Sequence, residues 1–460
     1  MKDLLIVGGG PGGYVAAVRA RQLGMEVTLF EQDKLGGTCL NRGCIPTKAY
    51  FKNAEVMRTL QHAGDYSLSC GEIQFSLAQA KARKDAIVNK LVTGVVSLLQ
   101  ANGVEVIQGH AEIINAVTVR ANGRDYSGRR ILVAAGSEPV SLPIPGMDLP
   151  GVITSTELLE LEEVPPRLVI IGAGVVGLEL ACIFNAFGSQ VTVLEAADHM
   201  LGSLDSELVK RMQVFLKRQG ITVHTGCSVQ EIQDRQDHLA VIAQDKKNAL
   251  LSAEAELVLA AAGRKAVTAG INLDQLGIAT EGGFIKVDAN FESSVQGIYA
   301  IGDVIGGPML AHVASEEGIV AVEKMCGVPS EVAYHAVPAC IFTFPEIATV
   351  GLSEDQAKAQ GIAYKTGKFQ FAANGKAMTM GEPDGLVKVI ADADDVIIGV
   401  HILGPHASDL ILEGTMMVKQ RMQAEAVRGV IHPHPTLGES IAEAVADLKG
   451  ESLHLLPRKK

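Results

Sequence analysis

The sequence predicts an α/β protein with two Rossmann-like dinucleotide-binding domains and a C-terminal α+β domain. Two observations carry this prediction. A buried strand, a glycine-rich turn and a helix occur at the N-terminus and occur again, in the same order, 164 residues later. From about Val337 onward, strands and helices follow one another without a glycine-rich phosphate turn, which indicates a domain without a nucleotide of its own.

The composition is that of a large globular protein. The chain has 460 residues, of which 47% are hydrophobic and 20% charged, enough for about three domains. The net charge is −12 and the only basic block is the terminal Arg458-Lys459-Lys460, expected to be a solvated tail, so nucleic acid is not an expected partner. Seven cysteines without regular spacing argue against a secreted disulfide framework. Because a strand follows Met1-Lys2-Asp3 at once, we expect no signal peptide and a cytoplasmic location.

The first nucleotide unit begins with Leu4–Val7, a continuous apolar run typical of a buried parallel strand. A helix is predicted over 14–23, and a second strand, Val27–Phe30, ends in Glu31. The turn between the first strand and the helix has the pattern G-x-G-x-x-G, formed by Gly8, Gly10 and Gly13. Such glycines let a pyrophosphate approach backbone N–H groups at the helix N-terminus, and the acid accepts hydrogen bonds from ribose hydroxyls.

The second unit repeats the first in register. Strand 168–171 leads to a glycine turn, a helix runs to Gly188, and strand 191–194 ends in an acid. The landmarks that stand 164 positions after their counterparts are Gly172, Gly174, Gly177 and Glu195. One G-x-G-x-x-G is weak evidence, but chance does not explain four landmarks in register. The apolar run 168–188 carries Glu179 at its middle, which is costly in a bilayer, so we expect no membrane span.

The rest of the chain connects and completes these units. A proline-rich linker, 139–150, follows Gly136 and marks the first domain boundary. After strand 297–301 comes Gly302-Asp303, whose acid could reach a ribityl or ribose hydroxyl or could simply form a turn. The other predicted helices cover 47–60 and 77–101 and start at Leu410 and Ile441, and the other strands cover 104–109, 117–120, 131–136, 257–262, 348–351, 387–390 and 396–404.

Two cysteines, Cys39 and Cys44, stand five positions apart. A disulfide there would close a short loop and stabilise the fold by roughly 2 kcal/mol, a gain that a chain of this size hardly needs. The pair therefore indicates redox chemistry. Spacing alone leaves open a reduced structural pair, a zinc half-site and a thioredoxin-type centre, although zinc usually requires a second matching pair and thioredoxins prefer C-x-x-C.

These features together resemble the flavin-dependent pyridine nucleotide-disulfide oxidoreductases, over essentially the whole chain. The resemblance rests on the cysteine segment, the paired units, Gly302-Asp303, Leu310-Ala311-His312 and the segment from His432 to Glu439. It implies FAD on the first unit, NAD on the second and a homodimer. The implied domains are an FAD-binding domain with a redox disulfide (1–147), an NAD-binding domain (148–270), a central segment completing the FAD site (271–336) and an interface domain (337–460).

Within this family, the pattern is most similar to members that oxidise protein-bound dihydrolipoyl groups and reduce NAD⁺. The implied partners are the lipoyl domains of a 2-oxoacid dehydrogenase or glycine cleavage complex. Two alternatives stay open: another disulfide reductase of the family, or a flavoprotein kept only for assembly. A glutathione-type enzyme would be expected to use NADPH, which conflicts with Glu195, and a mercuric-type enzyme would be expected to end in a cysteine pair.

The resemblance also implies residue roles. Cys39 would exchange with substrate and Cys44 would lie against the flavin as a thiolate. His434 would be a base oriented by Glu439, although His432 and His434 could both be structural, or could bind a metal if a third ligand existed. The lysine beside the flavin and its ion-pair partner would be Lys48 and Glu179, which could otherwise be a solvated lysine and a helix-dipole partner.

The implied cofactor contacts complete the set, and no metal is expected. FAD would be held by Gly8, Gly10, Gly13, Glu31, Lys48, Ala111, Gly136, Asp303 and Ala311. NAD would be held by Gly172, Gly174, Gly177, Glu195, Val229 and Gly263. Departures from the family pattern are Lys265-Ala266 where Pro-Asn is usual, Phe342 where Tyr is common, and Pro433 between the two histidines.

Overall fold

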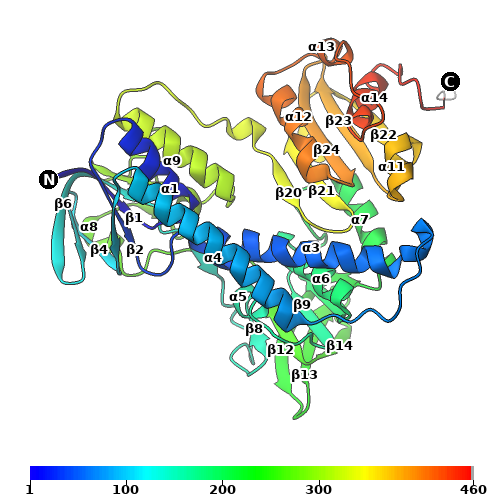
Figure 1. Cartoon of the computed structure of the whole chain (residues 1–460), viewed down its shortest axis with the longest axis horizontal. Coiled ribbons are helices and arrows are strands. Elements are labelled where there is room, and N and C mark those ends of the chain that lie inside the picture. The colour runs from blue at the N-terminus through cyan, green and yellow to red at the C-terminus, as the bar shows by residue number, and fades with distance from the viewer. Residues whose placement is uncertain (457–460) are drawn as a thin grey trace.

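The structure, a computed structural model, describes residues 1–456; the terminal basic block 458–460 lies outside the described residues. It has two nucleotide-binding units and a C-terminal domain (Figure 1). The sheet of the first unit contains five parallel strands, in the spatial order β3 (Glu105–Gln108), β2 (Val27–Glu31), β1 (Lys2–Val7), β6 (Arg124–Val133) and β19 (Ile298–Ala300). From β6 the sheet continues antiparallel through β5 (Thr118–Ala121) to β4 (Ala111–Asn115).

Helices cover the first unit and carry the cysteine segment. Helix α1 starts at Pro11, earlier than predicted, because a proline at the first helical position has no N–H group to satisfy. Figure 1 shows α9 beside α1. Since β19 joins the first sheet, the chain returns to the first unit after the second. The helices are α1 (Pro11–Gln22), α2 (Gly37–Arg42), α3 (Cys44–Gln61), α4 (Leu77–Ala101), α8 (Leu273–Leu276) and α9 (Ala311–Met325); β17 (Thr280–Glu281) and β18 (Phe284–Ile285) form a small hairpin.

The second unit has a parallel sheet of the same kind. Its order is β11 (Thr222–Thr225), β10 (Gln190–Glu195), β9 (Arg167–Ile171), β15 (Leu257–Ala260) and β8 (Val152–Ile153), with helices α5 (Ser155–Leu158), α6 (Val175–Phe187) and α7 (Ser206–Arg218). The sequence analysis missed an antiparallel sheet of β12 (Cys227–Asp234), β13 (Leu239–Asp245) and β14 (Leu250–Ala255), and a ribbon that pairs β7 (Ser137–Pro139) with β16 (Arg264–Ala266). Across residues 1–456, no helix has the length and apolarity to span a membrane.

The C-terminal domain is an antiparallel sheet flanked by helices. Its strand order is β20 (Ala339–Ile341), β21 (Glu346–Gly351), β24 (Ile397–Gly404), β23 (Leu386–Asp392) and β22 (Tyr364–Gln370). Its helices are α10 (Glu354–Ala359), α11 (Gly375–Met380), α12 (Ala407–Lys419), α13 (Ala424–Arg428) and α14 (Glu439–Asp447). Helices α12 and α14 start before Leu410 and Ile441, the predicted starts, because their polar first turns lie outside the apolar pattern.

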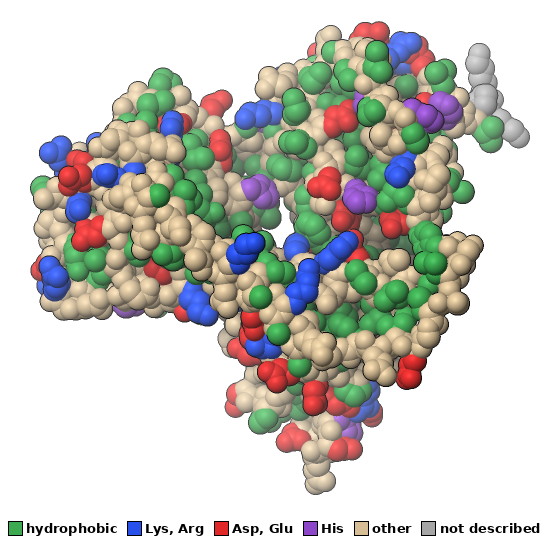
Figure 2. All heavy atoms as spheres, in the orientation of Figure 1, with side chains coloured by type: hydrophobic (Ala, Val, Ile, Leu, Met, Phe, Trp, Pro, Cys, Tyr) green, Lys and Arg blue, Asp and Glu red, His purple; other side chains and the backbone are tan. Residues whose placement is uncertain are grey.

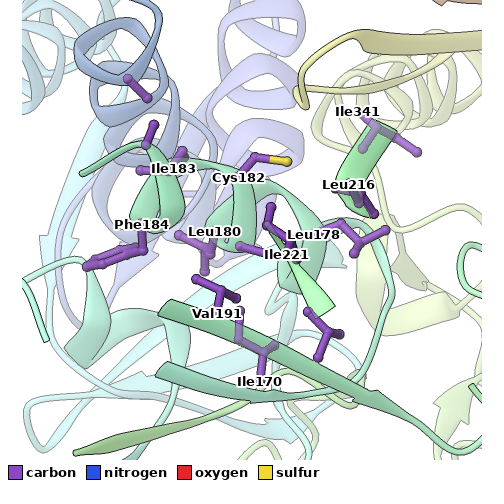
Figure 3. Packing of buried hydrophobic residues seen from close by; sticks show 14 of the residues in the cluster. Ile170, Leu178, Leu180, Cys182, Ile183, Phe184, Val191, Leu216, Ile221 and Ile341 are labelled. Carbon is purple, nitrogen blue, oxygen red and sulfur yellow. The ribbon is translucent and has the colours of Figure 1, made fainter. Parts of the chain in front are cut away.

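The largest hydrophobic cluster surrounds α6 and draws on all three parts of the chain. Figure 3 shows side chains of α6 packed between Ile170 and Val191 below and Ile341 of the C-terminal domain above. Tyr50 and Phe51 of α3 belong to the same cluster. One shared core therefore sets how α3, α6 and β20 meet. The exact domain boundaries stay a prediction. On the face shown in Figure 2, a notch separates the first unit from the C-terminal domain.

Candidate redox and cofactor sites

The two glycine turns have the same backbone geometry. Gly8 has φ +108° and Gly172 has φ +110°, a region that favours glycine. A Cβ on Gly13 would lie 1.9 Å from the carbonyl oxygen of Gly8, and one on Gly177 would lie 2.1 Å from that of Gly172. Neither α1 nor α6 has a side-chain cap or an acid in its first turn. The first N–H groups of both helices are therefore free for an anion, which fits a pyrophosphate.

The acids that end β2 and β10 occupy equivalent places beside these turns. Each carboxylate accepts one N–H of the glycine turn and one N–H two residues further along its own chain segment. The four bonds measure 2.7–2.8 Å: Gly9 and Asp33 donate to Glu31, and Ala173 and Ala197 donate to Glu195. All these residues keep the 164-residue spacing. Carboxylate oxygens held here fit ribose hydroxyls, which donate.

A cavity of about 600 Å³ opens beside the second turn. Its walls include five of the six residues predicted for NAD, namely Gly172, Gly174, Glu195, Val229 and Gly263. The sixth, Gly177, lies inside α6, where its missing side chain lets the helix approach the turn. The donor set and the space fit a pyridine nucleotide.

On the first unit, Asp303 lies in a polar network that sequence reasoning missed. The Ser137 hydroxyl donates to Asp303 Oδ2 at 2.5 Å, and Arg264 Nε donates to that hydroxyl at 2.7 Å. The β7–β16 ribbon that joins Ser137 to Arg264 is too short for a periodic signal. Of the other predicted FAD contacts, Gly136 precedes β7 with φ +75°, Ala311 starts α9, and Ala111 starts β4 and pairs with Ala121.

The two cysteines of the redox segment are free thiols in the structure. Cys39 lies in α2 and Cys44 starts α3, and both are half-buried. A hydrogen bond from the Cys39 thiol lowers the pKa of Cys44 to about 7, with help from the Lys48 cation and against the effect of burial. The same hydrogen bond and burial raise the pKa of Cys39. Cys44 therefore ionises before Cys39, and Cys39 keeps its proton.

Lys48 and Glu179 form an ion pair across two units. Lys48 Nζ lies 2.8 Å from Glu179 Oε2 and 3.0 Å from Oε1. Only 5% of the Glu179 side chain is exposed. Phe342 completes the group, because its N–H donates to Glu179 Oε1 at 3.0 Å and its ring centroid lies 4.4 Å from Lys48 Nζ. Neither a solvated lysine nor a simple helix-dipole partner describes this arrangement.

His434 pairs with Glu439. Its Nδ1 lies 2.9 Å from Glu439 Oε1, and the N–H of Thr436 donates to Oε2 at 2.8 Å. Burial opposes the charge of Glu439, but these two bonds keep its pKa below the usual range. The His434 side chain is 78% exposed, so its Nε2 faces outward, whereas His432 is only 10% exposed and bonds to Glu413. Within the described residues, no group of His, Cys, Asp and Glu could hold a metal ion.

His434 and the redox cysteines lie in different domains of one protomer. His434 lies between α13 and α14, which Figure 1 shows on the side of the C-terminal domain away from α3. Cys44 starts α3. One protomer therefore does not bring all the predicted catalytic residues together.

Comparisons with known proteins agree with this architecture. The family model of the pyridine nucleotide-disulphide oxidoreductases matches residues 2–318, and that of the dimerisation domain of the same family matches residues 337–445. The chain is 42% identical to a dihydrolipoyl dehydrogenase of Bacillus subtilis (strain 168), with 98% of this chain and 99% of the relative covered. It is 39% identical to a dihydrolipoyl dehydrogenase of Geobacillus stearothermophilus, with 99% and 98% covered.

A solved structure shares the fold as well. The flavoprotein disulfide reductase RclA of Escherichia coli matches with a TM-score of 0.86 and 29% identity, and the match covers 96% of this chain and 99% of RclA. These matches confirm the predicted fold class, the oxidoreductase class, the cofactors FAD and NAD and a C-terminal dimerisation domain. The chain belongs to the pyridine nucleotide-disulphide oxidoreductase family.

Proposed function

We propose that this chain is a dihydrolipoyl dehydrogenase that oxidises the dihydrolipoyl groups of lipoyl domains in a multienzyme complex and reduces NAD⁺. The observation that carries the proposal is the half-buried thiol pair beside the Lys48–Glu179 ion pair, in which Cys39 and Lys48 lower the pKa of Cys44. The full-length relatives named dihydrolipoyl dehydrogenase support the choice of substrate. A cytoplasmic location stays a prediction.

The cofactor sites follow the two repeated units. FAD would be held by the first glycine turn, Glu31 and Asp303, and NAD by the second glycine turn and Glu195. FAD, when bound, supplies a two-electron acceptor between the dithiol and NAD⁺. The protein's own residues provide the order of the thiol reactions and the movement of protons.

The dithiol reaction starts from the oxidised Cys39–Cys44 disulfide. A substrate thiol gives its proton to His434 of the partner subunit and attacks the Cys39 sulfur. The S–S bond breaks and Cys44 leaves as a thiolate, which its low pKa favours. The second substrate thiol then attacks the substrate sulfur bound to Cys39. Its proton goes to Cys39, so the substrate leaves as a cyclic disulfide and both electrons stay on the cysteine pair.

A second candidate is another disulfide reductase of the same family, which the likeness to RclA favours. A role confined to assembly would have no use for a polarised thiol pair. Glu195 argues against an enzyme of the NADPH-dependent kind, because its carboxylate would repel a 2′-phosphate.

Steady-state assays of the purified protein test the proposal. We expect rapid NADH formation from dihydrolipoamide and NAD⁺, and a kcat/KM for NADPH well below that for NADH in the reverse direction. Higher activity with glutathione disulfide and NADPH would favour the second candidate. If dihydrolipoamide failed to bleach the flavin absorption of the holoenzyme, the protein would not be a dihydrolipoyl dehydrogenase.

A further inference from the structure

A buried carboxylate on α9 takes no part in the mechanism above. Glu317 is only 2% exposed, and both its carboxylate oxygens accept hydrogen bonds. The N–H of Gly302 donates to Oε2 at 2.6 Å, and the hydroxyl of Tyr334 donates to Oε1 at 2.6 Å. Burial raises the pKa of Glu317 in spite of these bonds, so the ionised form of this carboxyl group is disfavoured in this place. A buried carboxyl group that organises its surroundings is a candidate for a functional role.

Glu317 binds the backbone of the Gly302–Asp303 turn, from which the Asp303 side chain projects. Gly302 has φ +72°, and a Cβ there would lie 3.1 Å from the Ala314 side chain, so α9 lies directly against the turn. Asp303 is the next residue, and its carboxylate accepts from Ser137. Because Gly302 tolerates many backbone conformations, the bond from its N–H to Glu317 selects one of them. That choice sets the direction of the Asp303 side chain.

The same helix also lies against the phosphate turn of the first unit. A Cβ on Gly318 would lie 2.7 Å from the carbonyl oxygen of Gly12, and a Cβ on Gly12 would lie 3.0 Å from that of Ala314. Figure 1 shows α9 running beside α1. Helix α9 therefore contacts both the first glycine turn and the Gly302–Asp303 turn, the two parts of the predicted FAD site. Glu317 makes the polar contact between α9 and the Gly302–Asp303 turn.

We propose that Glu317 is a positioning residue for FAD: with Tyr334, it holds the Gly302–Asp303 turn in the conformation in which Asp303 accepts a hydrogen bond from an FAD hydroxyl. The inference rests on the proposed function, in which Asp303 binds FAD. Glu317 itself would not touch the cofactor, so its effect must pass through Asp303.

The first test compares FAD affinity among variants. The fluorescence of FAD released on serial dilution of the holoenzyme gives the dissociation constant. We expect Glu317→Ala to raise it about tenfold, Glu317→Gln by less because an amide keeps one acceptor, and Tyr334→Phe by a few-fold. The adjacent Glu316 is exposed and provides the matched control, so Glu316→Gln should bind FAD like the wild type. If Glu317→Ala does not fold, the other two substitutions still test the proposal.

The second test asks whether the effect passes through Asp303. Asp303→Asn should weaken FAD binding, and Glu317→Gln added to it should cause less further loss than it causes alone. The KM for NAD⁺ at saturating FAD should not change with Glu317→Gln. Wild-type FAD affinity in the Glu317 variants, or fully additive losses, would overturn the inference while leaving the proposed function intact. Unchanged affinity in Asp303→Asn alone would overturn both the assignment of Asp303 and the inference.

Discussion

At the scale of single residues, the contact between the two cysteines gives them different pKa values. The Cys39 thiol donates and Cys44 accepts, so the negative charge concentrates on the sulfur that starts α3. A thiolate at a helix N-terminus also gains from the helix dipole. The depressed pKa of Cys44 means that its charged form predominates above about pH 7 and is lost as the pH falls through that value.

This division predicts different pH midpoints for two substitutions of Cys39. Cys39→Ser keeps a hydroxyl donor, so the thiolate-to-flavin absorption band of the oxidised variant should appear with a midpoint near pH 7. Cys39→Ala removes the donor, so the midpoint should shift upward toward the ordinary value for a cysteine. Absorbance titration of both variants measures the two midpoints. Equal midpoints would show that the hydrogen bond does not set the pKa of Cys44.

A second residue-scale prediction concerns Glu195. Glu195→Gln keeps the shape but removes the charge, and it weakens the acceptor for ribose hydroxyls. We expect kcat/KM for NAD⁺ to fall about tenfold and the ratio of NADP⁺ to NAD⁺ use to rise. The exposed Glu254 on β14 provides the control, so Glu254→Gln should leave both values unchanged. A loss of NAD⁺ activity with no change in the ratio would contradict a role in discrimination.

At the scale of elements, α3 and α6 come from different units, and their contact places two charged side chains where they affect the pKa of Cys44. Their contact brings Lys48 to Glu179, and the loop after β20 adds Phe342. The shared hydrophobic core around α6 holds these elements in place (Figure 3). The two charges act on Cys44 in opposite directions, because Lys48 lowers its pKa and Glu179 raises it.

The ion pair therefore predicts opposite shifts from its two members. Lys48→Met should raise the midpoint of the thiolate-to-flavin band, and Glu179→Gln should lower it, when both are measured in the Cys39→Ser protein. Lys52, one turn further along α3 and mostly exposed, is the matched control for the lysine. Shifts of the same sign in the two variants would mean that structural disturbance, not charge, dominates.

At the scale of the whole molecule, the exposed histidine implies a site shared between two protomers. His434 is 78% exposed and lies between α13 and α14, whereas its own Cys44 starts α3. Exposed apolar side chains lie on α12 and just before the histidine, namely Leu412, Met416, Val430 and Ile431. The C-terminal domain matches the family's dimerisation domain, and a two-fold dimer would generate two equivalent sites.

A mixing experiment tests this arrangement. Cys39→Ser and His434→Gln should each be inactive. Unfolding them together and refolding equal amounts should give mixed dimers in about half the population, each with one site free of both lesions, and about a quarter of wild-type activity. If His434 served its own chain, each site of a mixed dimer would carry one lesion. Mixed dimers detected without recovered activity would refute the shared site.

Local sequence patterns were enough to predict much of the fold of this protein. The strand–turn–helix units, their acids and the fold class were predictable, because glycine turns and buried strands are dictated by a few adjacent residues. The missed antiparallel sheet pairs strands that follow one another in the chain, but an irregularity between Val229 and Glu231 interrupts the alternation of β12. The Ser137–Arg264 ribbon pairs two three-residue strands that lie far apart in the sequence, which leaves little local signal.

The sequence by itself determined where two nucleotides and one thiol pair belong, since each is encoded within a short stretch of chain. Only the tertiary structure decided how Phe342 joins the Lys48–Glu179 pair, that Ser137 and Arg264 bind around Asp303, and which carboxylate supports the Asp303 turn. Those properties depend on burial and on partners such as Glu179 and Glu317, which lie far along the chain from the groups they contact. Distances and burial among such residues exist only after the chain has folded, because packing in three dimensions creates them.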